Sequence, residues 1–280
     1  MKWNFIRVFS YYEEGYSIMS RTTKSSLTNA LRILKSFSID HPELTLSEIS
    51  EFVGVSKSTA CRLIQTLESE GFIYQNILFN TYRLGSSVLT LSNTVIDQLA
   101  ILKETTYFLK QLTAQTGESS HIAILDNTDV IYLKKEDSHH RVQLLSHIGR
   151  RNPAHCTASG QAILAFVKPT TVEKLFEGGL DQATNYSFGS LPQLQQKLAT
   201  IREQGYSISK GELIENIVSI GAPIYNKNNQ VFAAINVAGP KQRILPNLQQ
   251  IVTNVLFTSK TMTNYVQSHE KDVDIETFIK

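Results

Sequence analysis

The chain has 280 residues, of which 41% are hydrophobic and 19% are charged, and its formal net charge is +2 at pH 7. This balance is typical of a folded globular protein and excludes a disordered chain, and no apolar run is long enough to cross a bilayer. The length predicts a small domain and a larger one, and the small net charge means that any DNA binding has to be argued from local pattern.

The first 24 residues are expected to form an N-terminal arm outside the folded domains. Glu13 and Glu14 interrupt its apolar residues and no small residues mark a cleavage site, so the segment does not resemble a signal peptide. Residues 1–18 are either a dispensable arm or the product of a start codon assigned too early. We therefore predict a cytoplasmic protein with no membrane partner.

Two helices are predicted from Ser25 onward. The first is capped by Ser25 or Ser26, and the second by Thr45, with Glu48 three residues on in capping-box register. The first helix has apolar residues at three- and four-residue spacings, and we expect this face to pack on one core. The apolar residues are Leu27, Ala30, Leu31, Leu34 and Phe37.

A third helix comes after the glycine turn at Gly54, is capped by Ser56 and runs to Gly71. Its inner face carries Ala60, Leu63, Ile64 and Leu67, and its outer face near the N-terminus carries Lys57, Ser58, Thr59 and Arg62. Short hydroxyls and cations at a helix N-terminus suit contact with phosphates and base edges. Since an isolated serine-rich helix start is more often just solvated, the assignment depends on the residues beyond Gly71.

Two short strands are predicted there, at residues 72–74 and 81–84, and three helices succeeded by a hairpin make a winged helix. Asn76, Asn80 and Arg83 could let the wing contact the DNA backbone or minor groove. The alternative is a winged helix that binds protein. Our predicted DNA-binding residues are Thr45, Ser56, Lys57, Ser58, Thr59, Arg62, Asn80 and Arg83.

A helix over residues 87–102 has an apolar pattern too strong for a free spacer, which predicts packing on a partner chain. A symmetric dimer would fix two recognition helices at the spacing of a pseudo-palindromic operator. Beyond residue 103 the pattern mixes helix and strand. We expect helices at 104–116, 159–167, 191–205 and 248–266, and strands at 120–125, 130–134, 217–225 and 231–237.

Several segments together resemble the IclR-type bacterial transcriptional regulators from about Ser25 to Gln267. They are residues 30–34, 55–60 (Val-Ser-Lys-Ser-Thr-Ala), 82–85 (Tyr-Arg-Leu-Gly), 153–162 (Pro-Ala-His-Cys-Thr-Ala-Ser-Gly-Gln-Ala) and 231–240. The resemblance implies an α+β chain with a winged helix-turn-helix, a linker helix and a GAF-like effector-binding domain built on an antiparallel sheet. It also implies a homodimer or a dimer of dimers.

The resemblance further implies that a small effector, often a carboxylate, binds in a cup beside the Pro-Ala-His segment. Carried over residue by residue, the lining comprises Leu144, Leu145, Ala158, Ser159, Ser209, Ser219 and Asn236. We expect Ser159 and Gly160 to open a helix whose free amides receive the carboxylate without a lysine or arginine. Ala238 and Ser209 depart from relatives that have a serine and an acidic residue there, so the ligand's identity stays open.

Other residues in this region suggest different chemistry. His155 and Cys156 would suit a histidine-activated thiol nucleophile. His139 and His140, with His121, His147 and His155 in the same domain, would suit a metal site. Adjacent residues seldom point at each other, and neighbours on a strand face opposite sides, so we expect a binding wall rather than a catalytic pair, and no metal. We expect Arg150 and Arg151 to belong to a loop or effector gate, and a second DNA-binding surface is the alternative that stays open. Cys61 and Cys156 lie too far apart in sequence to suggest a disulfide framework.

The sequence therefore predicts a DNA-binding transcriptional regulator that is controlled by a small metabolite and needs no cofactor. Repression is favoured, and activation stays open. The alternative is an enzyme or metal-dependent sensor that uses His155 and Cys156 and has a winged helix that does not bind DNA. The expected segments are an arm at 1–24, the DNA-binding domain at 25–86, the linker at 87–102, the effector domain at 103–270 and a tail at 271–280.

Overall fold

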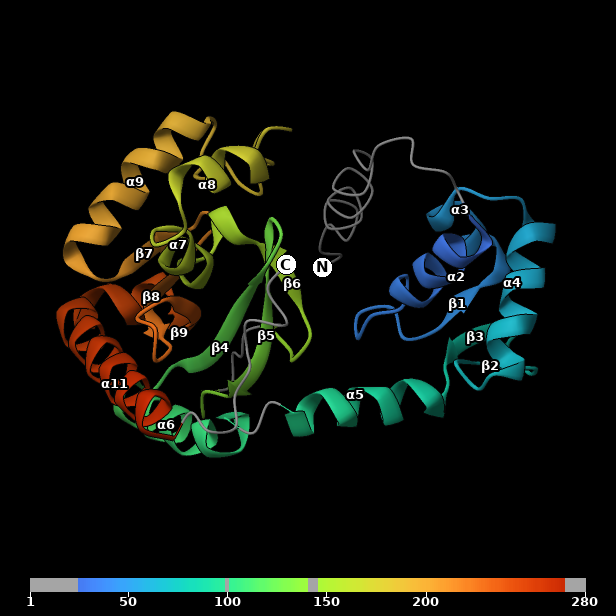
Figure 1. Ribbon diagram of the computed structural model, residues 1–280, viewed down its shortest axis with the longest axis horizontal. Coiled ribbons are helices and arrows are strands. Elements are labelled where there is room, and N and C mark those ends of the chain that lie inside the picture. Colours follow the sequence, from blue (N-terminus) through green and yellow to red (C-terminus); the bar gives the residue numbers. More distant parts are fainter. Residues whose placement is uncertain (1–24, 99–100, 141–145, 270–280) are drawn as a thin grey trace. The chain divides into compact units, whose positions relative to one another are not determined.

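The computed structural model describes residues 25–98, 101–140 and 146–269, and the chain divides into two compact units, residues 1–98 and 99–280 (Figure 1). The predicted arm and C-terminal tail lie outside the described residues. Among the residues that are described, no helix is both long and apolar enough to cross a membrane.

The first unit contains the three predicted helices, each begun by the predicted cap. Ser25 Oγ accepts a hydrogen bond from the Thr28 amide over 3.1 Å, and Ser56 Oγ accepts one from the Thr59 amide over 3.2 Å. These bonds satisfy backbone donors that a helix leaves free at its start. The helices are α2 (Ser26–Lys35), α3 (Leu46–Val53) and α4 (Lys57–Ser69).

The core of this unit forms where the three helices meet the sheet, and Ile33, Ile49 and Ile64 are almost completely buried there. The prediction that Leu27 and Leu31 face this core is wrong, because 69% and 51% of their surfaces are exposed. The buried side of α2 centres on Ile33, and a residue two positions away on a helix points to nearly the opposite side.

The predicted hairpin is present as β2 (Ile73–Asn76) and β3 (Thr81–Leu84). A third strand, β1 (Leu44–Thr45), pairs with β3 in the order β1-β3-β2 and was not predicted, because two residues are too few to show a period. Helix α5 (Ser86–Gln98) then occupies most of the predicted linker, and residues 99–100 lie outside the described part.

The second unit is built on a six-stranded antiparallel sheet in the order β6-β5-β4-β9-β8-β7. The four predicted strands are confirmed. The two edge strands, β6 and β7, were missed because each is short and only partly apolar. The strands are β4 (Ser119–Asp126), β5 (Asp129–Glu136), β6 (Arg151–Pro153), β7 (Ser207–Lys210), β8 (Ile217–Tyr225) and β9 (Val231–Pro240).

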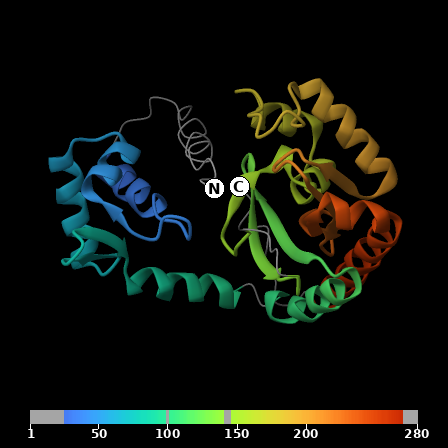
Figure 2. The same ribbon diagram turned by 180° about the vertical axis from the view of Figure 1, so that it is seen from behind.

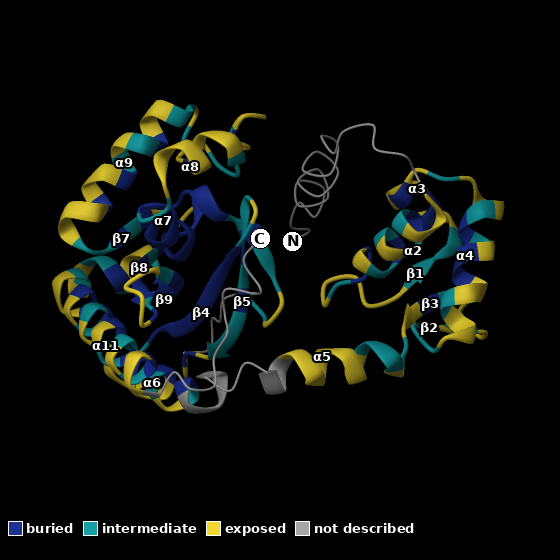
Figure 3. Ribbon diagram, viewed as in Figure 1, coloured by how far each residue is buried: buried dark blue, intermediate teal, exposed yellow. Residues whose placement is uncertain are grey.

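Helices cover both faces of this sheet, with α6 and α11 on one side and α7 to α9 on the other (Figures 1 and 2). Because both faces are covered, the central strands are buried along almost their whole length (Figure 3). The helices are α6 (Ile101–Thr116), α7 (Ala158–Leu164), α8 (Pro169–Leu175), α9 (Leu191–Gln204), α10 (Lys241–Ile244) and α11 (Leu248–His269).

Candidate functional site

The outer face of α4 presents the side chains expected there. Lys57, Ser58 and Arg62 are exposed, Thr59 is half-buried, and Ala60 on the inner face is buried. The helix therefore offers two cations and a hydroxyl to solvent from its first turns, which is the arrangement that suits a nucleic-acid groove.

The hydroxyls at the start of α4 also contact one another. Ser56 Oγ lies 3.0 Å from Ser58 Oγ and 2.9 Å from Thr59 Oγ1, in addition to accepting from the Thr59 amide. Ser56 is therefore the N-cap of the helix as well as a predicted DNA contact. The cluster holds three short polar side chains at the end where the helix dipole favours phosphate.

Thr45 completes a capping box at the start of α3. Its amide donates to the Glu48 carboxylate over 2.7 Å, and its hydroxyl accepts from the Glu48 amide over 3.3 Å. The Thr45 amide, and the Thr45 hydroxyl over 2.8 Å, both donate to the Glu48 carboxylate and hold its pKa below its usual value. In the structure Thr45 fixes the beginning of α3, and its contact with DNA stays a prediction.

The wing carries the two remaining predicted DNA contacts. Asn80 is exposed in the turn between β2 and β3, with a positive φ of 52° that asparagine tolerates better than most residues. Arg83 is also exposed, and its guanidinium lies 4.8 Å from the centre of the Tyr74 ring. The aromatic ring steadies the cation without neutralising it.

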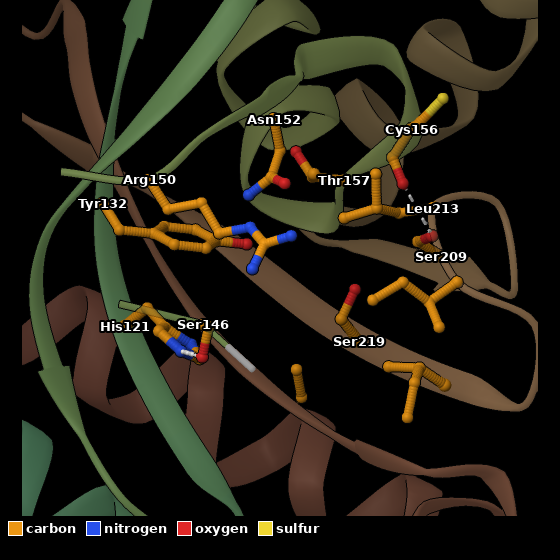
Figure 4. Close-up of a pocket in the computed structure, with 13 residues that line it drawn as sticks. His121, Tyr132, Ser146, Arg150, Asn152, Cys156, Thr157, Ser209, Leu213 and Ser219 are labelled. Atoms are coloured by element: carbon orange, nitrogen blue, oxygen red, sulfur yellow. Dashed lines mark hydrogen bonds between the residues drawn. The ribbon is translucent and has the colours of Figure 1, made fainter. Parts of the chain in front are cut away.

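A pocket of about 60 Å³ lies in the second unit, on the face of the sheet that α7 covers (Figure 4). Ser209 and Ser219, two of the predicted effector residues, line it from β7 and β8. They are directly opposite each other in the β7–β8 ladder, and Ser219 is in turn opposite Ala238 on β9. Cross-strand neighbours share one face of a sheet, so the register brings these residues together.

Ser209 has a structural partner in the pocket wall, because its hydroxyl donates to the Cys156 carbonyl over 3.1 Å. Asn236, another predicted effector residue, is opposite His121 in the β4–β9 ladder and is only 2% exposed. Among the described residues, neither Asn236 Oδ1 nor His121 Nδ1 has a hydrogen-bond partner. Buried polar atoms of this kind are normally satisfied, so they mark where a polar guest or water would bind.

The predicted anion site at the start of α7 is wrong in one respect. The Gly160 amide is not free, since it donates to Thr157 Oγ1, the N-cap of the helix, over 3.0 Å. Ala158 and Ser159 are almost completely buried, and Cys156 and Thr157 line the pocket in their place. Gly221 of β8 permits this packing, because a Cβ there would lie 2.6 Å from the Ala158 carbonyl oxygen.

The two leucines predicted in the lining, Leu144 and Leu145, lie outside the described residues. The next residue, Ser146, lines the pocket, and its Oγ lies 2.8 Å from His121 Nε2. His121 stacks on Tyr132 with ring centres 4.7 Å apart. Burial lowers the pKa of His121 to about 3 and raises that of Tyr132 to about 12. Both rings are therefore uncharged at neutral pH.

Arg150, which was expected in a loop or effector gate and not among the lining residues, lines the pocket, and it is the one side chain charged at neutral pH among the described residues of the pocket wall. Its guanidinium points into the pocket toward Ser219 (Figure 4). We expected a carboxylate to be bound without an arginine, and the presence of Arg150 in the pocket wall differs from that expectation. Arg150 directly precedes the short strand β6, so no strand pattern in the sequence marked it as a lining residue.

The thiol of Cys156 points away from the pocket (Figure 4), with its Sγ 3.9 Å from the Asp181 carbonyl oxygen. Burial raises the pKa of Cys156 to about 11, so the thiol stays protonated at neutral pH. His155 Nε2 lies 2.8 Å from the same carbonyl oxygen. The residues of the enzyme alternative are thus part of a buried wall. In the described part of the chain, no three His, Cys, Asp or Glu side chains are grouped to hold a metal.

Two families match the chain. Residues 93–263 match the family described as "Bacterial transcriptional regulator IclR C-terminal", and residues 26–76 match the "IclR helix-turn-helix domain". The regulator XynR of Escherichia coli is 31% identical over 78% of this chain and 87% of its own length. The regulator KdgR of the same organism is 28% identical over 84% of this chain and 89% of its own length.

Solved structures show the same architecture. An IclR regulator from Silicibacter is 26% identical, with a TM-score of 0.76 over 87% of this chain and 96% of that one. An IclR regulator from Alicyclobacillus acidocaldarius is 25% identical, with a TM-score of 0.75 over 86% of this chain and 98% of that one. These likenesses confirm the predicted α+β fold, with a helix-turn-helix domain and a C-terminal domain on a curled antiparallel sheet. The chain therefore belongs to the IclR family of bacterial transcriptional regulators and is a DNA-binding regulator rather than an enzyme.

Proposed function

We propose that this regulator is a repressor whose affinity for its operator is set by a small carboxylate metabolite bound in the pocket of the C-terminal unit. The observation that carries this proposal is the Arg150 guanidinium, which points into a pocket whose other described walls are uncharged at neutral pH. A guanidinium fork matches a carboxylate in shape and charge, and a wall of low polarity strengthens the attraction.

The remaining polar groups suit the rest of such a ligand. Ser219 offers a hydroxyl, and the Asn236 amide and the His121 ring contribute buried polar atoms nearby. The volume of about 60 Å³ equals the space of about four to six waters, which favours a small metabolite. The proposed effector contacts are Arg150, Ser209, Ser219 and Asn236, together with Leu144 and Leu145 of the predicted set.

On the DNA side, we place the outer face of α4 in the major groove and the wing beside it. The proposed contacts are Thr45, Ser56, Lys57, Ser58, Thr59, Arg62, Asn80 and Arg83. Helix α5 leaves Leu89, Leu91 and Val95 exposed, which supports its burial in a homodimer or a dimer of dimers. A symmetric pair would read a two-fold operator.

The names of relatives include both a repressor and an activator. IclR of Escherichia coli, at 28% identity, is a transcriptional repressor, and a 26% identical protein of Acinetobacter baylyi is the p-hydroxybenzoate hydroxylase transcriptional activator. We favour repression, because the ligand then releases the operator simply by binding more tightly to the conformation of the regulator that does not fit the operator. Such coupling is typically worth about 1 to 3 kcal/mol, or roughly 5- to 150-fold in affinity.

The proposal is tested by measuring operator binding in the presence of matched small molecules. An operator duplex is first selected from random DNA with the full-length protein. Its affinity is then measured by fluorescence anisotropy with carboxylates, such as benzoate, 4-hydroxybenzoate and short hydroxy acids, and with the corresponding amides. We expect at least one carboxylate to weaken binding by roughly 5- to 150-fold and its amide to have no effect. Equal effects of acid and amide would contradict the proposed carboxylate class.

The sign of regulation is tested with a reporter gene placed behind the selected operator. A repressor lowers expression when the protein is present, and the active carboxylate restores it. Expression that rises with the protein would show an activator.

A further inference from the structure

The tip of the wing exposes three consecutive large apolar side chains. Ile77, Leu78 and Phe79 are 84%, 90% and 73% exposed, and they form the turn between β2 and β3 (Figure 3). The hairpin's own core residues, Ile73 and Tyr82, are buried against the helices of the same unit. The apolar tip therefore adds nothing to this core.

Such exposure is costly and points to a partner. Burying a large apolar side chain is favourable, and the isolated chain leaves three consecutive ones in water. Scattered apolar residues on a surface need no explanation, but a contiguous group at the end of a hairpin marks a contact site.

The surroundings of the tip favour DNA as that partner. The hairpin, residues 72–84, contains no aspartate or glutamate, and its single charge is Arg83. Asparagines flank the tip on both sides, as Asn76 and Asn80, and can bond to phosphates or base edges. Glu68 and Glu43 place carboxylates on Gln75 and Thr81 below the turn, whereas the tip itself, residues 76–80, has no acidic side chain that the polyanionic backbone of DNA would repel.

The wing is also held in a fixed position beside the proposed recognition helix. The Gln75 amide at the middle of β2 donates to the Glu68 carboxylate of α4 over 3.3 Å. β2 and β3 pair from Ile73–Leu84 up to Asn76–Thr81, directly below the tip. A helix seated in the major groove would thus carry the wing to the neighbouring minor groove, where architectural proteins insert apolar wedges between base pairs.

We propose that the wing tip is such a wedge: Leu78 and Phe79 enter the minor groove, separate a pair of stacked base pairs and kink the operator. This inference rests on the proposed seating of α4 in DNA. The wedge contributes to sequence selection without reading base edges, because pyrimidine–purine steps such as TA unstack more easily than others. The operator carries a flexible step of this kind where the wing meets the duplex.

The experiment measures DNA bending by energy transfer between dyes at the two ends of the selected operator duplex. The wedge variant is Ile77→Ser/Leu78→Ser/Phe79→Ser, and the matched control is Ile39→Ser, which removes an apolar side chain that is 64% exposed in the same unit. We expect the wild type and the control to bend the duplex to the same extent. The wedge variant is expected to bind the duplex without bending it, and to lose the preference for a flexible step.

A second measurement tests insertion directly without truncating the tip. In a Trp3→Phe background, Phe79→Trp supplies the single tryptophan of the chain. Stacking on a base quenches indole fluorescence, so DNA should quench Phe79→Trp and leave Ile39→Trp in the same background unchanged.

Three results would overturn the wedge: bending by the wedge variant equal to that of the wild type, a straight duplex bound by the wild type, or no quenching of Phe79→Trp. Loss of self-association by the wedge variant, measured by light scattering without DNA, would instead make the tip a protein interface. Failure of the wild type to select any duplex would contradict the proposed DNA-binding surface itself, which is a different result from a duplex bound straight.

Discussion

The Arg151 guanidinium donates to the Asp126 carboxylate over 2.6 Å (Nη1–Oδ2) and to that of Asp129 over 3.2 Å (Nε–Oδ2). These bonds tie the edge strand β6 to the β4–β5 turn. Arg150, which directly precedes β6, and Asn152 within the strand line the pocket. Two adjacent arginines thus have separate roles, one holding the strand in place and the other facing the ligand.

Arg150→Met is expected to lower affinity for the carboxylate effector and to leave operator binding without effector unchanged. Hydrogen bonds to a charged group are worth about 1.5 to 3 kcal/mol, so the loss should be roughly 10- to 150-fold. Isothermal titration of the effector measures it. The effector affinity of Arg150→Lys should fall between that of the wild type and that of Arg150→Met, because lysine keeps the positive charge but lacks the two-pronged guanidinium.

A matched control for Arg150→Met is Arg202→Met, which removes an arginine exposed on α9. It should titrate like the wild type. An Arg150→Met protein with unchanged effector affinity would remove the guanidinium from the binding site and, with it, the main support for a carboxylate ligand.

Ser219→Leu is expected to retain operator binding and to lose the effector response. The added side chain would project from β8 into a pocket of about 60 Å³ and leave little room for a ligand. Ser219→Ala serves as the control, because it removes the hydroxyl without filling the space, and it should weaken the response by much less. A normal response of Ser219→Leu in the operator-binding assay would place the effector elsewhere.

Stability should depend on pH through His121. Burial is the main cause that lowers its pKa to about 3 from 6.5, with the Lys135 charge adding to the effect and Asp137 opposing it. Between these values the unfolded chain binds a proton that the native ring does not. The free energy of unfolding therefore falls as pH drops below about 6.5, by about 2 kcal/mol at pH 5.

Urea unfolding of the wild type and of His121→Gln, at several values between pH 7 and pH 5, measures this contribution. Subtracting the two curves cancels other titrating groups, such as Glu212, whose pKa burial raises. The wild type should lose more stability than the variant as the pH falls. Parallel curves would show that His121 is not buried in its neutral form.

Lys57 and Arg62 are expected to contribute differently to operator binding. Arg62→Ala should cost about 1 to 3 kcal/mol if the guanidinium contacts a base edge, and should relax sequence preference at that position. Lys57→Ala should weaken all duplexes alike and reduce the salt slope by about 1, as expected for a phosphate contact. Gel-shift titrations at several salt concentrations separate the two effects, and Lys35→Ala, on the exposed side of α2, is the control.

The first unit was largely predictable because its signals are local. Ser25, Thr45 and Ser56 cap their helices as expected, and the three- and four-residue spacing of Ala60, Leu63 and Ile64 identified the inner face of α4. The exposure of Leu27 and Leu31 was not predictable, because spacing gives a stripe but not which neighbouring residues lie against it. The apolar tip also has no distinct signal, since an Ile-Leu-Phe run resembles a buried strand.

The pocket was only partly predictable because it depends on register. Ser209 and Ser219 were expected from the family resemblance, whereas His121 lies on β4, which is buried on both faces, so that alternation is hidden there. The Gly160 amide was assigned to a ligand because a helix start has free donors, but a neighbouring threonine satisfies it. Local sequence shows that a donor exists and not which acceptor reaches it.

The most direct test of the account compares Arg62→Ala and Arg150→Met in one pair of assays, operator affinity and effector affinity, both on the full-length protein. We predict that Arg62→Ala loses operator affinity and binds the effector normally, and that Arg150→Met does the reverse. A variant that changes both affinities alike, or that changes neither, would contradict the account. It would show that DNA recognition by α4 and carboxylate recognition by the pocket are not two separate functions of this chain.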